Sequence, residues 1–94
     1  MKPQHVPNVD PFDYAQERYQ EGREVLLAFV IRASGSLEIG TVCAVCDDGN
    51  TAGDAAFAAI IMQAAADHVA AVIDTGDPVE TQIGEAIVFL DRIG

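Results

Sequence analysis

The chain has 94 residues, of which 15 are acidic and 5 are basic, so its formal net charge at pH 7 is −10. This charge argues against direct binding to nucleic acids or to anionic membranes, because both are bound through clustered lysine and arginine. Half of the residues are apolar, which allows one small core in a single domain over residues 1–94.

The beginning of the chain predicts an arm followed by a short helix. Residues 1–9 contain two prolines and are expected to form a flexible arm. Asp10 followed by Pro11 is typical of a helix start, and Gly22 can end the helix. The apolar side of this helix is expected to be formed by Phe12, Ala15 and Tyr19.

Acidic side chains form the strongest candidate for a binding surface. At about 100° per residue, five of them would fall within an arc of roughly 80° on a helix. The five residues are Asp10, Asp13, Glu17, Glu21 and Glu24. Like charges at this spacing repel, and Arg18 is expected to lie away from them. The stripe therefore indicates a surface for a basic partner, and the alternative is an ordinary solvated helix face.

Two strands are expected next, in residues 24–33 and 37–46, with a turn over residues 34–36. In the first strand Val25, Leu27, Phe29 and Ile31 face one way, and Leu26, Ala28 and Val30 face the other. In the second strand one face is expected to carry Leu37, Ile39, Cys43 and Val45. Strands this close in sequence most simply form an antiparallel hairpin.

An alanine-rich helix over residues 51–73 and a third strand over residues 83–92 complete the prediction. Thr51 and Asp54 resemble a capping box at the helix start. The inward face of the helix is expected to consist of Phe57, Ile61, Ala64, Ala65, His68 and Val72. The third strand is expected to lie antiparallel beside the first, with Ile87 and Phe89 on one face and Ala86, Val88 and Leu90 on the other.

These elements predict an α+β fold in the order α-β-β-α-β, with the long helix packed on a small sheet. The first and third strands are apolar on both faces, whereas one long helix covers only one face. The other face must therefore meet the N-terminal helix, a second copy of the chain or a partner.

The residues that most often carry chemistry do not form a recognisable catalytic or metal site. Cys43 and Cys46 are three apart, so on a strand they point to opposite faces and cannot easily share a zinc ion or a disulfide. His68 is expected at the edge of the core. A calcium site at residues 47–54 lacks the ligand pattern of an EF-hand, and a turn with a helix cap explains its acids. No cofactor, no metal and no catalytic residue is therefore predicted.

The sequence favours a non-enzymatic protein that binds a basic, nucleic-acid-binding surface on another protein, and thereby inhibits it. Short acidic chains without enzymatic motifs occur among phage-encoded inhibitors such as anti-CRISPR proteins, and the analogy is one of size and charge. The start of the chain lacks an apolar signal, so a cytoplasmic location is expected. One alternative is a homodimeric assembly module that uses an apolar sheet face. Another is a small enzyme or metal protein built on His68 and the cysteines.

Overall fold

A computed structural model describes residues 4–6, 9–35 and 37–93 of the chain. The described part forms an α+β domain with three helices and a six-stranded mixed sheet. In chain order the elements are β1 (His5–Val6), α1 (Pro11–Gln20), β2 (Val25–Arg32), β3 (Val42–Cys46), β4 (Thr51–Gly53), α2 (Ala55–Ala64), α3 (Ala66–Thr75), β5 (Val79–Ile83) and β6 (Ala86–Arg92).

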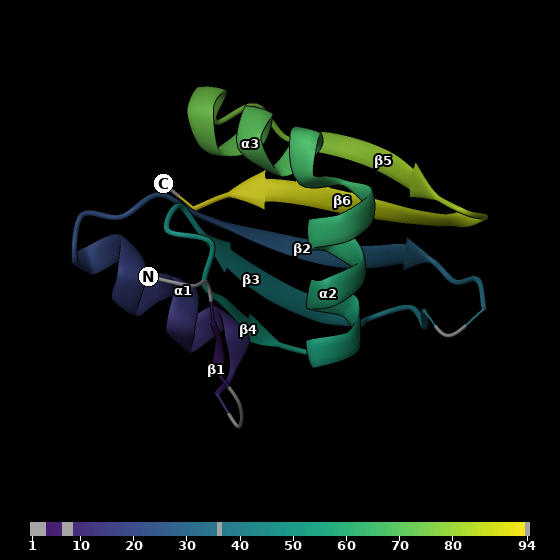
Figure 1. Ribbon diagram of the computed structural model, residues 1–94, viewed down its shortest axis with the longest axis horizontal. Helices are drawn as coiled ribbons and strands as arrows, with labels where there is room; N and C mark the ends of the chain where they lie inside the picture. Colours follow the sequence, from purple (N-terminus) through teal and green to yellow (C-terminus); the bar gives the residue numbers. More distant parts are fainter. Residues whose placement is uncertain (1–3, 7–8, 36, 94) are drawn as a thin grey trace.

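The sheet has the strand order β1-β4-β3-β2-β6-β5 and separates two layers of helices. All neighbouring strands are antiparallel except β1 and β4, which are parallel. Helices α2 and α3 pack on one face, where α2 runs across the strands and α3 lies beside β6 (Figure 1). Helix α1 packs on the opposite face against β2, β3 and β4.

The strand faces agree with the alternation predicted from the sequence. Leu26, Ala28 and Val30 lie in the core under α2 and α3, whereas Val25 and Leu27 lie under α1. Strand β6 pairs with β2 in the antiparallel sense that was predicted. The second sheet face is covered in part by the N-terminal helix, which is one of the three predicted possibilities. Helix α1 leaves the β6 side of that face without a helix.

The single long helix predicted over residues 51–73 is wrong. Residues 51–53 form β4, Asp54 caps α2, and the helix breaks at Ala65, where α2 and α3 meet at 88°. The bend changes which residues face inward. Phe57, Ile61, Ala65 and Val72 are buried as predicted, but Ala64 and His68 are exposed, and Ala58 and Val69 are buried instead.

Strands β3 and β5 also differ from the prediction, so the order α-β-β-α-β is wrong. Residues 37–41 turn before β3 begins, with Gly40 at φ +90° and Ile39 71% exposed. Residues 79–92 form a hairpin of β5 and β6 that turns at Gly84, where a single strand was expected over residues 83–92. Within the expected arm, residues 5–6 form β1, while residues 1–3 and 7–8 lie outside the described part.

No single helix in the described part is long and apolar enough to cross a membrane. Helices α2 and α3 reach that length and composition only when taken together, across their 88° bend.

Candidate partner-binding surface

Helix α1 carries most of the predicted acidic stripe, and its two ends are fixed by local hydrogen bonds. The carboxylate of Asp10 accepts hydrogen bonds from the backbone N–H groups of Phe12 (2.8 Å) and Asp13 (3.4 Å). Pro11 occupies the first helical position, and Gly22, at φ +86°, follows the C-cap Glu21. The predicted helix limits are therefore confirmed.

Four of the five stripe acids remain together on this helix. Asp10, Asp13, Glu17 and Glu21 are exposed and recur at spacings of three or four residues, which places them along one flank. Glu24 lies beyond the helix, immediately before β2, where its carboxylate contacts Arg92. The structure thus brings four of the predicted residues into one row and places the fifth beside another element.

Arginine side chains do pair with the stripe, contrary to the prediction for Arg18. The Arg18 guanidinium contacts the carboxylates of Glu17 and Glu21 and lies 5.4 Å from the centroid of the Tyr14 ring. Its Nε is buried without a hydrogen-bond partner. Exposed ion pairs contribute little stability, about 0–1 kcal/mol each. Within the described part, Asp13 is the one member of the row whose side chain neither caps a helix nor forms an ion pair.

The turn between β3 and β4 extends the acidic surface beside α1. Burial raises the pKa of Tyr14 to about 12, and the neighbouring Cys46, Asp48 and Glu21 add to this rise. Partial burial opposes ionisation of Asp47, but hydrogen bonds from the Glu24 backbone, Arg23 and Cys46 lower its pKa below the usual value. The carboxylate of Asp47 is therefore held in its charged form.

Aromatic side chains lie on the other flank of α1. Of the predicted apolar side, Ala15 is buried as expected, but 49% of the surface of Phe12 and 48% of that of Tyr19 are exposed, and Tyr14 is buried in their place. The rings of Phe12 and Phe29 lie 6.0 Å apart. Beyond Phe29 the uncovered part of the sheet carries partly exposed Ile31, Ile87 and Phe89. The α1 face of the molecule thus combines an acidic flank with an apolar one.

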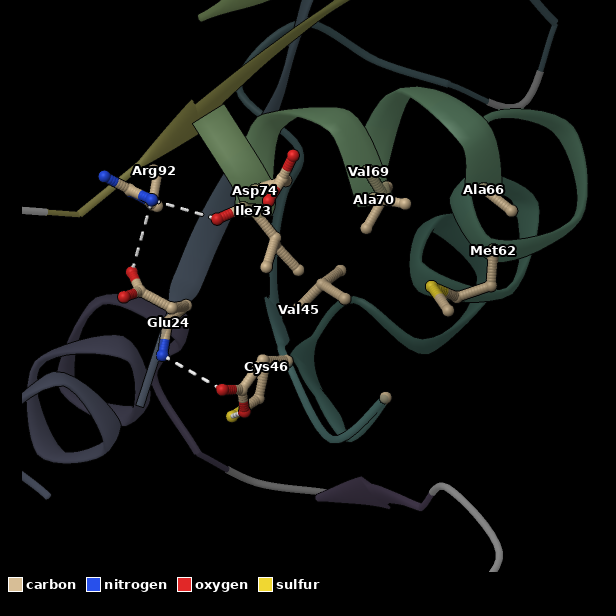
Figure 2. A pocket seen from close by; sticks show the side chains of 12 residues that line it. Glu24, Val45, Cys46, Met62, Ala66, Val69, Ala70, Ile73, Asp74 and Arg92 are labelled. Carbon is tan, nitrogen blue, oxygen red and sulfur yellow. Dashed lines mark hydrogen bonds and ion pairs between the residues drawn. The ribbon is translucent and has the colours of Figure 1, made fainter. Parts of the chain in front are cut away.

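A cleft of about 540 Å³ lies beneath α3, where β2 begins and β3 and β6 end. Glu24 and Arg92 lie at one end of it, and Met62 and Ala66 lie at the other, as Figure 2 shows. Its charged lining consists of Glu24, Asp47, Asp74 and Arg92. Its apolar lining consists of Val45, Met62, Ala66, Val69, Ala70 and Ile73, with Cys46 and Gly49 completing the wall. Sequence reasoning missed this cleft because its walls come from segments far apart in the chain.

The two cysteines lie on opposite faces of the sheet, as predicted. Cys43 belongs to the core under α2 and α3, and Cys46 belongs to the core under α1. Both are free thiols, and burial raises the pKa of Cys43 to about 12 and that of Cys46 to about 11. They are therefore poor nucleophiles at neutral pH.

One group of residues places three ligand atoms close enough for a metal ion: Cys46, Asp47 and Asp48. Each already has a local hydrogen bond. The Cys46 thiol donates to Asp47 (3.4 Å), and Asp48 accepts from the backbone N–H of Asn50 (2.9 Å). As predicted, the acids of this segment hold a turn, and Asp54 caps α2 by accepting from Phe57 (2.8 Å). The geometry is that of a stabilised turn.

The histidines do not form a catalytic constellation in the described part of the chain. His68 is exposed on α3, so its predicted position at the edge of the core is wrong. The Nδ1 atom of His5 lies 2.9 Å from the hydroxyl of Thr51, beside a smaller cavity of about 310 Å³. This hydrogen bond ties β1 to β4, and no third group in the described residues orients the imidazole.

Comparisons of the chain with protein families, with curated proteins and with solved structures find no match.

Proposed function

We propose that the protein is a non-enzymatic binding protein whose α1 face docks on a basic surface of another protein. The partner surface is of the kind that binds nucleic acid, and occupying it inhibits the partner. The proposed contacts are Asp10, Asp13, Glu17 and Glu21 on α1, with Glu24 beside the cleft. The type of activity is that of phage-encoded inhibitors, anti-CRISPR proteins included, by analogy of size and charge.

The row of exposed carboxylates along α1 is the observation that carries this proposal. Carboxylates four residues apart on a helix are separated by about 6 Å along its axis, similar to the phosphates of an extended nucleic-acid strand. Only Arg18 offsets this row on the helix itself, and the acids of the β3–β4 turn lie beside it. The exposed aromatic residues on the other flank provide apolar area of the kind found in the centre of protein interfaces.

The test is a pull-down from a bacterial lysate with three forms of the protein. The first is the unchanged chain, and the second carries Asp13→Lys, Glu17→Lys and Glu21→Lys. The third is a control with Asp67→Lys, Asp77→Lys and Glu85→Lys, which makes the same change in net charge on α3, after α3 and in the turn between β5 and β6, away from α1. The proposal expects the unchanged chain and the control to capture the same basic proteins, and the α1 variant to lose them.

Competition distinguishes an occluded nucleic-acid site from other basic surfaces. An added DNA or RNA oligonucleotide should release the captured proteins. Salt raised from about 50 to 500 mM should release them as well, because screening weakens exposed charge pairs. Equal capture by all three forms would contradict the proposal.

The second candidate function is a homodimeric assembly module. The observation that favours it is the uncovered part of the sheet, where Phe29, Ile31, Ile87 and Phe89 lie beside half-exposed Phe12. Apolar side chains gathered on one sheet face are typical of an interface. Its test is the oligomeric state in solution, which is argued at the scale of the whole molecule below.

A further inference from the structure

We propose that the cleft beneath α3 receives a lysine side chain of the partner protein. The inference rests on the proposed function, because it takes the lysine from the basic surface that docks on this protein. It adds a specific pocket, whose lining can be tested with a small molecule in the absence of any partner. The cleft lies between α3, the turn after β3 and the adjoining ends of β2 and β6.

The arrangement of the lining selects an occupant with an apolar stem and a charged head. Met62, Ala66 and Ala70 lie together at one end of the cleft, and Glu24 and Arg92 lie at the other, with Val45 between them (Figure 2). The described lining contains no aromatic side chain on which a planar guanidinium could stack. An aliphatic stem with a compact ammonium group therefore fits this lining better than an arginine.

The charges at the polar end favour a cation. Three carboxylates line the cleft, those of Glu24, Asp47 and Asp74, against one guanidinium, that of Arg92. Arg23 lies outside the cleft and pairs with Asp47 at 3.2 Å. When Arg23 is included, the three carboxylates still exceed the two guanidinium groups by one negative charge. The lining would therefore repel an anionic head.

Arg92 is fixed at the rim by groups of the protein itself. Its Nη1 donates to the carbonyl oxygen of Ile73 (2.9 Å) and lies 3.5 Å from the carboxylate of Glu24 (Figure 2). A carboxylate accepts more than one hydrogen bond, so Glu24 retains capacity for an ammonium group. Asp74 lines the cleft from α3 and forms no ion pair within the described residues, so it adds an uncompensated negative charge to the lining.

The test uses n-pentylammonium, which has the head and slightly more than the stem of a lysine side chain. The probe is titrated into ¹⁵N-labelled protein while amide chemical shifts are recorded. Saturable shifts are expected at residues 45–49 and 62–74. Two further probes with five carbon atoms, n-pentanol and n-pentanoate, separate the contributions of stem and charge. We expect weaker binding of the alcohol and no saturable shifts with the carboxylate.

Variants of the lining locate the probe. Asp74→Asn should weaken n-pentylammonium binding about fivefold, since an exposed charge pair contributes about 1 kcal/mol. Ala70→Leu should weaken binding because its larger side chain occupies part of the apolar end of the cleft, whereas Asp67→Asn, which is exposed on the same helix outside the lining, should change nothing. The proposal is overturned if n-pentylammonium gives no saturable shifts at these residues, if n-pentanoate binds equally, or if Asp74→Asn and Asp67→Asn behave alike.

The pull-down with the Ala70→Leu variant separates this inference from the proposed function. Probe binding without any partner captured through α1 would support the pocket and count against the proposed function. Partner capture that is lost on reversal of the α1 acids but unchanged by Ala70→Leu would support the proposed function and overturn the lysine pocket.

Discussion

At the scale of single residues, the positions of the cysteines followed from the sequence, because strand alternation places residues three apart on opposite faces. The behaviour of Arg18 did not follow. Its backbone position on α1 was predictable, but its long side chain reaches Glu17 and Glu21, and helical angles alone do not specify such a reach. The number of charged residues in the sequence therefore does not show which charges on the surface are paired.

The buried thiols predict a loss of stability in alkaline solution. In the unfolded chain the cysteines ionise near their ordinary pKa of 9.0, whereas in the folded chain the pKa values are about 12 for Cys43 and about 11 for Cys46. Above pH 9 the unfolded state thus binds fewer protons, and the free energy of unfolding falls with rising pH. The slope should reach at most about 1.4 kcal/mol per pH unit for each thiol.

Urea denaturation between pH 8 and 10 measures this slope. The double variant Cys43→Ala, Cys46→Ala will be less stable at every pH because it leaves cavities, but its stability should depend less on pH in this range. Parallel curves for the two proteins would show that the thiols are not the groups responsible.

At the scale of single elements, helix α1 permits the charge of Asp10 to be separated from its capping role. Asparagine caps a helix about as well as aspartate, so Asp10→Asn should leave thermal stability nearly unchanged. Asp10→Ala should cost about 1 kcal/mol, because the N–H groups of Phe12 and Asp13 lose their acceptor. Both variants remove one negative charge from the proposed binding surface.

Thermal unfolding and partner affinity, measured on the same two proteins, check this prediction. Equal weakening of affinity by the two variants would mark an electrostatic role for Asp10. If only Asp10→Ala weakens binding, Asp10 acts through the helix and does not belong to the interface.

Strand β4 contains a glycine whose replacement should be costly. At Gly53 φ is +97°, and an added Cβ would lie 2.7 Å from the carbonyl oxygen of Val42. Gly22 has a similar φ of +86° but no atom within 4 Å of that position. We expect Gly22→Ala to cost about 1 kcal/mol, from backbone strain alone, and Gly53→Ala about 3 kcal/mol. Chemical denaturation of both variants measures the difference, and equal costs would show that β4 moves freely away from β3.

The elements that the sequence predicted well are those with a strong local signal. The Asp10–Pro11 start and Gly22 mark α1, and the alternation of β2 marks its faces. The break at Ala65 has no such signal, because alanine favours a helix on either side of it. The bend lets α2 pack on β3 and β4 while α3 packs on β6, so packing against the sheet overrides local propensity. Strand β5 was missed although Val79, Thr81 and Ile83 alternate with Glu80 and Gln82, which is itself the pattern of a half-buried strand.

At the scale of the whole molecule, no local pattern predicted the cleft. Alternation in β2 and β6 predicted a second apolar sheet face, but it did not predict which part of that face α1 leaves uncovered. Glu24, Asp74 and Arg92 come together only through the packing of β2, α3 and β6. The acidic row of α1 was predictable because it lies within one helix. The part of the candidate surface that lies within α1 could therefore be predicted from the sequence. The parts that are brought together by packing of distant elements could not.

The sign of the salt dependence separates the two candidate functions. Two copies of a chain with net charge −10 repel each other, so dimerisation through the uncovered sheet should strengthen as salt rises. Sedimentation velocity at micromolar concentration in about 50 and 500 mM salt measures it. A dimer that forms at high salt and is lost with Phe89→Lys would support the assembly module. A monomer under both conditions would contradict that candidate.

The most direct test of binding through α1 is the affinity for one captured partner as a function of salt. The unchanged chain, the Asp13, Glu17 and Glu21 reversal and the Asp67, Asp77 and Glu85 reversal are compared by calorimetry, after circular dichroism has shown that all three fold. We expect affinity to fall steeply with salt for the unchanged chain and for the control, and to be at least tenfold weaker at low salt for the α1 reversal. Unchanged affinity of the folded α1 reversal at low salt would contradict binding through α1 and leave its acids as a solvated face.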